Sequence, residues 1–423
     1  MASAGVRKRT STRTGRVSYE VWWRLDDGSQ SSKTFTKKVA AIEFKNAFLA
    51  KGGANLLRQR RIRFQDWADQ WWATWSSHPR RSPTSLQATD IRLRRYVRPR
   101  FDDRPVHAIT VAEVQQWQNA LESRLAVETV MACRSVLYRI LQAAEDEGIT
   151  VNPVRKVPAP KRPVDPEVVF GRVKRRTLTP EEAGRLLACV SHSWWDHVIS
   201  LLGTGLRISE LTGLQAFRVD LADDRLEVVE TRYEAGRFGK GLKDRPKSDA
   251  SVREVPLPRQ VAEAIARQMP PGGEPTALVF TGPGGGFRRR RGERTAMSRN
   301  NFRRVYQRAV AKGAADQEAG LAHLHLRGPH DLRHTYATWL EEEGIPTRVI
   351  DELMGHSGGH RVGEGSAMGR IYRHTTPEMQ ARVAAVLEAR LAVTLEVAAK
   401  LVDKRATAMP GAARWQEWRA GQG

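Results

Sequence analysis

The sequence is poor in cysteine and has no long apolar run. Cys133 and Cys189 are its only cysteines, and each lies in a stretch of helix-like apolar periodicity. Two such residues make neither a disulfide framework nor a cysteine metal site, so we expect both in hydrophobic cores. No window approaches the roughly 18 uninterrupted apolar residues of a membrane-spanning helix, and the N-terminus lacks the apolar core of a secretory signal. We therefore expect a soluble, cytoplasmic protein.

Acidic residues are also scarce. The 423 residues include 70 Lys and Arg against 47 Asp and Glu, a formal net charge of +23. Such an excess repels itself unless a polyanion is bound, so nucleic acid is the first expected partner and an anionic membrane surface the second. A nucleoside triphosphate is not expected, because the stretch TGPGGGFRRRRG at 281–292 lacks the Lys-Ser/Thr pair of a phosphate cradle. We interpret it as a basic loop that meets DNA backbone.

Residues 1–58 predict a small basic module. From 17 to 35, apolar and polar residues alternate around Asp27-Gly28, a strong hairpin signal, and an amphipathic helix follows. We expect Trp22 and Trp23 to serve the core and the sheet surface rather than to stack on bases. We interpret the residues before this alternation as a disordered basic arm. Because so short a unit stabilises itself poorly, its expected use is recognition.

Residues 59–155 predict a domain of four helices, one of which begins with a capping box made by Thr110 and Glu113. Helices with apolar faces and basic outer stripes are often merely solvated. In a chain of this charge we favour a DNA-facing role, with the candidates Arg92, Arg94 and Arg95. Residues 156–176 then combine prolines and basic residues without periodicity, which is typical of an extended linker.

A second core begins after this linker, where Thr179, Pro180 and Glu182 form a helix start with a capping box. Within it, Arg207 stands at a glycine-containing bend before a helix, a place suited to grip an anion. Glu210, three residues on, is placed to hold the guanidinium. By itself this pattern is more often an ordinary surface pair.

Further cationic and proton-transferring groups follow along the chain. Lys247 lies in a hairpin between strand-like segments, where a lysine is by default solvated. In HDLRH, His330 and Arg333 share one helix face. His356 comes at a helix end in LMGHSGG, and Tyr372 precedes a helix that a Thr-Pro pair would start.

Five motifs carry a resemblance to the tyrosine recombinases, the phage integrase family. They are TGLRISEL, PKSDASVREVPL, HDLRHTYATWL, LMGHSG and RIYRH, which follow the family's order and approximate spacing over roughly the C-terminal half. The resemblance implies cleavage and rejoining of DNA strands through a covalent 3′-phosphotyrosyl link, with no metal ion or other cofactor. It implies a supporting role for Glu210 and the catalytic set Arg207, Lys247, His330, Arg333, His356 and the nucleophile Tyr372.

The same resemblance implies the fold and the partners. We expect a mainly α fold with small β elements (α+β): a β-β-(β)-α module that resembles arm-site-binding domains, a helical core-binding domain, a mixed α/β-hairpin catalytic domain at 177–400, and a tail at 401–423. The expected partners are double-stranded DNA attachment sites, a homotetramer on DNA, and accessory directionality or DNA-bending proteins, but no membrane. The expected reaction integrates or excises a mobile element. Further DNA-binding candidates are Lys243, Arg299, Arg303 and Arg304.

Some alternatives about the site stay open at this point. The pairs His330/His334 and His356/His360 have the i, i+4 spacing that can also seat zinc, although no carboxylate ligand is well placed beside them. Tyr336, on the packing side of its helix, competes poorly as the nucleophile. A type IB-like topoisomerase shares the tyrosine chemistry, and a DNA-binding regulator with a dead site is a third interpretation. The complete set of six catalytic residues argues against the regulator.

Two features concern assembly. Sixteen positions separate His356 from Tyr372, more than is usual in the family, so Tyr372 can be delivered within its own protomer or across to a neighbour. The apolar stripe of residues 376–402 suits packing on a neighbouring subunit and, almost equally, packing on its own chain.

Overall fold

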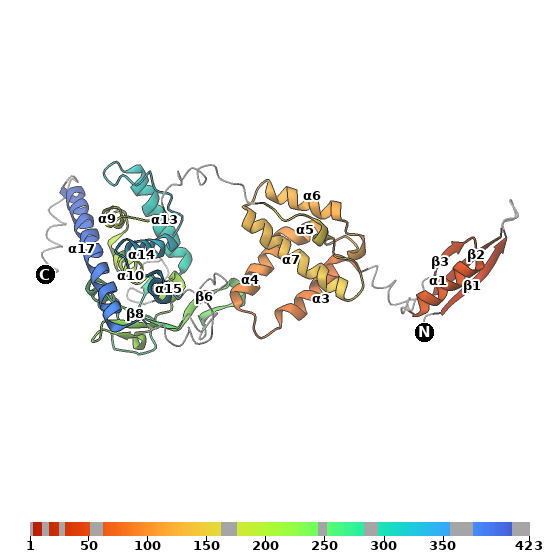
Figure 1. Ribbon diagram of the computed structural model, residues 1–423, viewed down its shortest axis with the longest axis horizontal. Coiled ribbons are helices and arrows are strands. Elements are labelled where there is room, and N and C mark those ends of the chain that lie inside the picture. Colours follow the sequence, from red (N-terminus) through yellow and green to blue (C-terminus); the bar gives the residue numbers. More distant parts are fainter. Residues whose placement is uncertain are drawn as a thin grey trace. The chain divides into compact units, whose positions relative to one another are not determined.

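The computed structural model describes residues 3–10, 17–24, 30–50, 62–161, 176–243, 252–282, 295–355 and 375–407. The chain divides into two compact units, Met1–Val164 and Asp165–Gly423 (Figure 1). The described elements are mainly helices with small antiparallel sheets, which confirms the expected α+β class. No helix in these ranges is long and apolar enough to cross a membrane.

The N-terminal module is a three-stranded antiparallel sheet packed against one helix. Its strands lie in the order β1-β2-β3, and α1 contacts all three. The expected β2–β3 hairpin is confirmed, while its Asp27-Gly28 turn lies outside the described residues. Trp23 is buried against Phe44 of the helix, and the ring of Trp22 lies over Gly5 on the sheet. These positions agree with the roles expected for the two residues in the core and on the sheet surface. The bounds are β1 (Ser3–Thr10), β2 (Val17–Arg24), β3 (Gln30–Phe35) and α1 (Lys38–Ala50).

Strand β1 shows that the expectation of a disordered basic arm was wrong for its eight residues. It pairs with β2 along its full length, with Arg7 opposite Glu20. The guanidiniums of Arg7 and Arg9 lie 2.7 and 2.6 Å from the Glu20 carboxylate. Val6 of the same strand packs on the module's small core. The basic segment forms a strand because a carboxylate on the neighbouring strand neutralises part of its charge.

A helical domain follows in the first unit. Helix α4 continues through a π-helical turn, η1, into α5, and together with α3, α6 and α7 they make the expected four-helix arrangement. Thr110 and Glu113 cap α6 reciprocally, as predicted. Cys133 is a free, buried cysteine of this core. The bounds are α3 (Phe64–Ser76), α4 (Pro83–Arg92), η1 (Leu93–Val97), α5 (Arg98–Phe101), η2 (Val106–Ala108), α6 (Val111–Glu122), α7 (Val127–Asp146) and η3 (Pro153–Lys156).

The second unit combines helices with short antiparallel strands. One sheet has the order β4-β5-β8, β6 and β7 form a hairpin, and β9 pairs with β10. The strand bounds are β4 (Val219–Asp220), β5 (Arg225–Val228), β6 (Thr231–Glu234), β7 (Lys240–Lys243), β8 (Arg253–Pro256), β9 (Thr281–Gly282) and β10 (Thr295–Ala296).

Two helices of this unit begin where the sequence signals predicted. Thr179 and Glu182 form the capping box of α9, and the C-terminal helix begins at Pro377 with Thr376 accepting a hydrogen bond from Met379. The helices are α9 (Pro180–Leu187), η4 (His192–Trp194), α10 (Trp195–Thr204), α11 (Ile208–Leu211), η5 (Ala216–Arg218), η6 (Gly236–Phe238), α12 (Arg259–Gln268), α13 (Arg299–Ala315), α14 (His330–Glu342), α15 (Thr347–Met354) and α17 (Pro377–Thr407).

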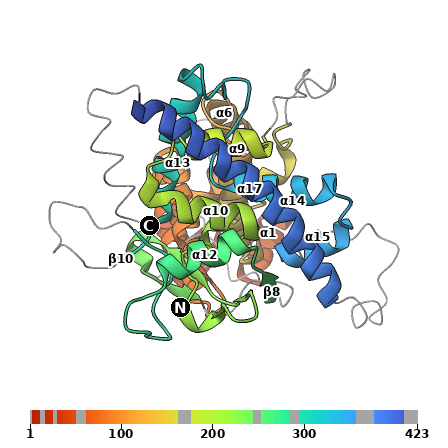
Figure 2. The same ribbon diagram turned by 90° about the vertical axis from the view of Figure 1, so that its left-hand side faces the viewer.

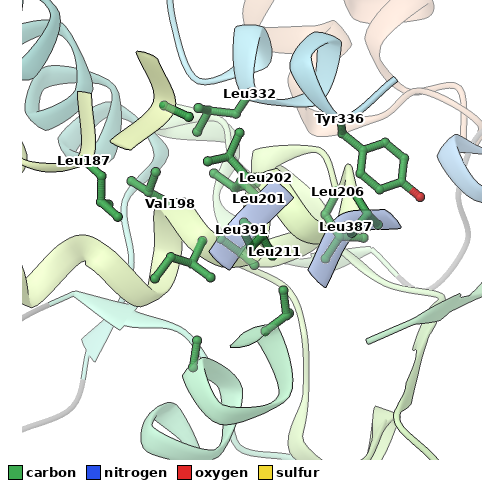
Figure 3. Packing of buried hydrophobic residues seen from close by; sticks show 14 of the residues in the cluster. Leu187, Val198, Leu201, Leu202, Leu206, Leu211, Leu332, Tyr336, Leu387 and Leu391 are labelled. Carbon is green, nitrogen blue, oxygen red and sulfur yellow. The ribbon is translucent and has the colours of Figure 1, made fainter. Parts of the chain in front are cut away.

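The core of the second unit is built around α10. Leucines of α10 pack against Leu332 and Tyr336 of α14 and against Leu387 and Leu391 of α17 (Figure 3). Helix α17 lies across α9 and α10 (Figure 2), and its stripe packs there, with Val383 fully buried and Leu395 partly buried. The stripe therefore packs on its own chain, the second of the two alternatives, because the unit's hydrophobic core needs this cover.

Candidate active site

A left-handed glycine sets the position of Arg207. Helix α10 ends at Gly205, whose φ is 62°, and the ring of Tyr336 packs so closely there that a Cβ on this glycine would lie 2.5 Å from it. Only glycine adopts this conformation without strain and fits that space. The chain then turns into α11 with Arg207 at the residue before its first turn. The bend that precedes the arginine is thus held by packing from α14.

Glu210 holds Arg207 in place from within α11. Its carboxylate accepts hydrogen bonds from the backbone N of Arg207 at 2.8 Å and from the Arg207 guanidinium at 2.7 Å. A second guanidinium nitrogen of Arg207 donates to the carbonyl oxygen of Gly355 at 3.2 Å. The Arg207 side chain is 35% exposed, while that of Glu210 is 2% exposed. One arginine face is therefore fixed to the protein and the rest faces solvent.

Arg333 lies next to this pair but is completely enclosed. It donates to the carbonyl oxygen of Gly205 at 2.5 Å and to that of Met354, and it lies 3.9 Å from the Glu210 carboxylate. Burial, with the nearby charge of Arg207, lowers the pKa of Arg333 to about 10. It remains a cation at neutral pH.

Arg253, the first residue of β8, is the third guanidinium at this carboxylate. Two of its nitrogens lie 3.0 and 3.3 Å from the oxygens of Glu210, and its Nε donates to the carbonyl oxygen of Leu353. Burial by itself raises the pKa of Glu210, but the charge and hydrogen bonds of Arg253, with those of Arg207, bring it below the ordinary value. The carboxylate is therefore ionised.

Arg253 was not among the residues predicted from the sequence. Its signal is weak but present: in β8 the alternating residues Arg253 and Val255 are both buried. An arginine at an inward position of a period-two strand needs a buried partner. That partner, Glu210, lies 43 residues away along the chain, so no local pattern connects the two.

His330 begins α14, one turn before Arg333. Its ring packs edge-on against His334 with 4.8 Å between centroids. Partial burial of the ring, then the charges of His334 and Arg333, lower the pKa of His330 below its ordinary value. A neutral imidazole beside two cationic guanidiniums can accept a proton from an attacking group. Within the described ranges, no group of three or more His, Cys, Asp or Glu side chains lies close enough to hold a metal ion.

The N-terminal half of α14 is also tied to the segment that enters the unit. The Arg176 guanidinium lies 2.7 Å from the Asp331 carboxylate, which also accepts hydrogen bonds from the backbone of the loop before the helix. Further along the same helix, the Thr335 hydroxyl accepts a hydrogen bond from the backbone N of Leu178, and the indole N of Trp339 donates one to the Leu178 carbonyl oxygen. These contacts hold the helix that carries both His330 and Arg333.

The remaining candidates from the sequence are either outside the described residues or in the β6–β7 hairpin. Lys247, His356, His360 and Tyr372 are outside the described residues. Lys243 ends β7 and is half-buried, opposite Thr231 in the hairpin. The structure therefore brings together Arg207, Glu210, His330 and Arg333.

The candidate DNA-contacting arginines occupy two helical surfaces. Among those of the helical domain, Arg92 is half-buried, Arg94 is exposed and paired with Asp90 at 3.0 Å, and Arg95 lies over the ring of Tyr96. On α13 of the second unit, Arg303 and Arg304 are exposed and Arg299 is half-buried.

The arrangement around Glu210 carries excess positive charge. Three guanidiniums surround one carboxylate, and the partly exposed one faces solvent. Planar guanidiniums bind the paired oxygens of phosphate groups by two parallel hydrogen bonds. The site is thus suited to an anion with a tetrahedral oxygen arrangement.

The residues of this site lie within a region that matches a known protein family. The profile of the phage integrase family matches residues 176–378, and that of the phage integrase N-terminal SAM-like domain matches residues 63–122. The tyrosine recombinase XerA of Thermococcus kodakarensis is 31% identical over 280 residues, which are 66% of this chain and 82% of that protein.

Comparison with solved structures agrees on the fold. The Tn1549 transposon integrase in complex with transposon right end DNA is similar with a TM-score of 0.54 and 21% identity, over 76% of this chain and 98% of that one. A lambda integrase tetramer bound to a Holliday junction gives a TM-score of 0.53 and 17% identity, over 84% of this chain and 97% of that one.

Proposed function

Because the chain belongs to the phage integrase family of tyrosine recombinases, we propose that it cleaves and rejoins specific DNA sites through a covalent 3′-phosphotyrosyl intermediate. The observation that supports this most directly is the cluster of Arg207, Arg333 and His330 around Glu210. Arg207 precedes α11, whereas His330 and Arg333 lie on α14, far along the chain, and their shared position has a chemical use in transfer of a phosphoryl group.

The two arginines are assigned to the phosphate. Attack on a DNA phosphodiester passes through a five-coordinate phosphorus with extra negative charge on its non-bridging oxygens. Arg207 is proposed to stabilise that charge by hydrogen bonds, and Arg333, which is enclosed in the protein, by its positive potential. Loss of one such stabilising group typically slows a reaction on the order of 10²-fold or more. Of the two, Arg207 is the one that reaches solvent.

The proton transfers are assigned to the histidine and the hairpin lysine. A tyrosine hydroxyl with a pKa near 10 is about three units from ionising at pH 7, which amounts to roughly 4 kcal/mol. His330 is proposed as the base that removes the proton of Tyr372, supported by its lowered pKa. Lys247 is proposed to protonate the leaving 5′ oxygen, and His356 to donate to a phosphate oxygen. The phosphotyrosyl bond conserves the energy of the phosphodiester, so rejoining consumes no nucleotide.

The domain assignment is part of the proposal. Residues 1–58 would bind a second class of DNA site, 59–155 the core site, and 177–400 would carry the chemistry, with a linker at 156–176 and a tail at 401–423. The basic β1 strand and the exposed arginines of α13 support DNA contact by both units. A module of this kind before the core-binding domain favours integration and excision of a mobile element. We further propose a homotetramer on two attachment sites, accessory bending or directionality proteins, and a cytoplasmic location at the nucleoid.

The test is capture of the protein on a nicked suicide DNA substrate, followed by mapping of the linked peptide. Tyr372→Phe should abolish the covalent complex and leave duplex binding nearly unchanged, because only a hydroxyl is removed. Tyr336→Phe is the matched control, since this tyrosine is buried in the core and its hydroxyl has no partner in the described part of the chain. Covalent capture by the Tyr372→Phe protein would refute the assignment. A two-site recombination assay beside a supercoil-relaxation assay distinguishes a recombinase from a topoisomerase.

A further inference from the structure

The buried carboxylate of Glu210 faces more cations than its charge requires. Arg207 and Arg253 both form ion pairs with it, at 2.7 and 3.0 Å, yet their surroundings differ. The Arg253 side chain is only 4% exposed, whereas that of Arg207 is 35% exposed. The two arginines therefore have different roles in the site.

Arg253 is fixed on several sides. Its two terminal nitrogens reach both oxygens of Glu210, while Nε donates to the Leu353 carbonyl oxygen at the end of α15. Gly355, in the left-handed conformation, leaves room for it, since a Cβ there would lie 2.8 Å from an Arg253 nitrogen. A side chain enclosed in this way has no path to a ligand in solvent.

Arg333 cannot replace Arg253 as the buried partner of Glu210. Its terminal nitrogens donate to the carbonyl oxygens of Gly205 and Met354, and its closest approach to the carboxylate is 3.9 Å. It adds positive potential, but the forked hydrogen bonds to Glu210 come from Arg253. The carboxylate thus has one permanent buried partner and one partner at the surface.

The energetic consequence concerns Arg207. A buried carboxylate without a counter-ion is strongly unfavourable, so a carboxylate held only by Arg207 would retain it against any incoming phosphate. With Arg253 in place, Glu210 stays neutralised when Arg207 changes partners. Arg207 can then exchange one carboxylate oxygen for a phosphate oxygen at small cost.

We propose that Arg253 is a positioning residue that serves as the permanent counter-ion of Glu210 and thereby frees Arg207 to grip the scissile phosphate. The proposal rests on the strand-cleavage function proposed above. It predicts an effect on the rate of covalent capture: removing the charge of Glu210 should compensate for the loss of Arg253.

The experiment compares wild type, Arg253→Met, Glu210→Gln and the double variant. The rate of covalent capture on a nicked suicide substrate is measured under single-turnover conditions, with duplex binding and thermal unfolding measured in parallel. Arg253→Met should slow capture on the order of tenfold or more with little change in binding. The double variant should be faster than Arg253→Met and within about threefold of Glu210→Gln, because two mutations that act on one ion pair are not additive.

A conservative variant keeps the test decisive if Arg253→Met does not fold. Arg253→Lys retains a cation beside Glu210 and should capture DNA within about threefold of wild type. A folded Arg253→Lys protein that loses tenfold or more, or a double variant slower than Arg253→Met, overturns the proposal. If wild type itself forms no covalent complex, the proposed function fails. If wild type is active but Glu210→Gln gives no compensation, only the role of Arg253 fails.

Discussion

The guanidinium of Arg333 donates a hydrogen bond to the carbonyl oxygen of Gly205 at 2.5 Å, and its other terminal nitrogen donates to that of Met354. One buried side chain thus ties α14 to the bend before Arg207 and to the end of α15. The two arginines assigned to the phosphate therefore differ in what else they do, since Arg333 is also part of the framework.

This difference predicts separate effects on stability and catalysis. Arg333→Met should lower the free energy of unfolding by about 3 kcal/mol or more, because buried carbonyl oxygens lose their donor. Arg207→Ala should lower it much less, since Arg207 is partly exposed and Glu210 keeps Arg253. Both variants should slow covalent capture on the order of 10²-fold. Urea unfolding and single-turnover cleavage test this, and equal losses of stability in the two variants would contradict it.

A second prediction concerns the bend at Gly205. Gly205→Ala should cost about 2 kcal/mol or more of unfolding free energy, because the residue has a φ of 62° and its Cβ would overlap the ring of Tyr336. Gly273→Ala is the matched control: its φ is 69° but nothing lies within 4 Å of the added carbon. The control should cost only about 1 kcal/mol. Similar losses for both, measured by thermal or urea unfolding, would mean that the contact with Tyr336 is unimportant.

The third prediction follows from the lowered pKa of His330. If its neutral ring removes the tyrosine proton, covalent capture should slow as the ring becomes protonated, with an inflection on the acid side of about pH 6.5. His330→Asn should be slower and should lack this inflection. The rate of capture against pH in single-turnover reactions tests both expectations. A variant that keeps the wild-type pH profile would exclude His330 as the base.

The fourth prediction concerns acid stability and His197 in the core. Burial lowers the pKa of His197 to about 4, whereas an unfolded chain binds this proton near pH 6.5. The unfolded state therefore gains protons first as the pH falls, so stability is complete above about pH 6.5 and is lost towards pH 4, by up to about 3 kcal/mol.

Urea unfolding at several pH values checks this, with two variants for comparison. His197→Gln cannot be protonated, and its unfolding free energy should depend less steeply on pH between 6.5 and 4. His325→Gln, at an exposed histidine of the same unit, is the control for the substitution itself. An unchanged slope in the His197 variant would assign the acid sensitivity to other groups.

The fifth prediction concerns the exposed arginines of α13. Arg304→Gln should reduce DNA affinity for all sequences alike and lower the slope of log affinity against log salt by about 0.9, the value for one lost phosphate contact. Lys400→Gln on α17 is the control, because Lys400 is exposed but paired with Glu396 at 2.6 Å. Fluorescence anisotropy at several salt concentrations measures the slopes. Equal slopes for wild type and Arg304→Gln would mean that α13 does not face the DNA at Arg304.

Local patterns were reliable where neighbouring residues set the structure. The capping boxes at Thr110 and Thr179 and the helix start at Pro377 follow from contacts within three or four residues, so composition and spacing predicted them. The placement of His330 and Arg333 on one helix face has the same origin. The order of the five motifs was likewise available from the residues alone.

Other features depend on residues far apart in the chain. Residues 3–10 form a strand because β2 offers Glu20 to their arginines, and the stripe of α17 is buried because α9 and α10 lie beneath it. Arg253 meets Glu210 across 43 residues, and Arg333 reaches carbonyl groups of two other elements. Such contacts form only when the whole core packs, since the free energy of burying a charge depends on which partners the fold brings to it.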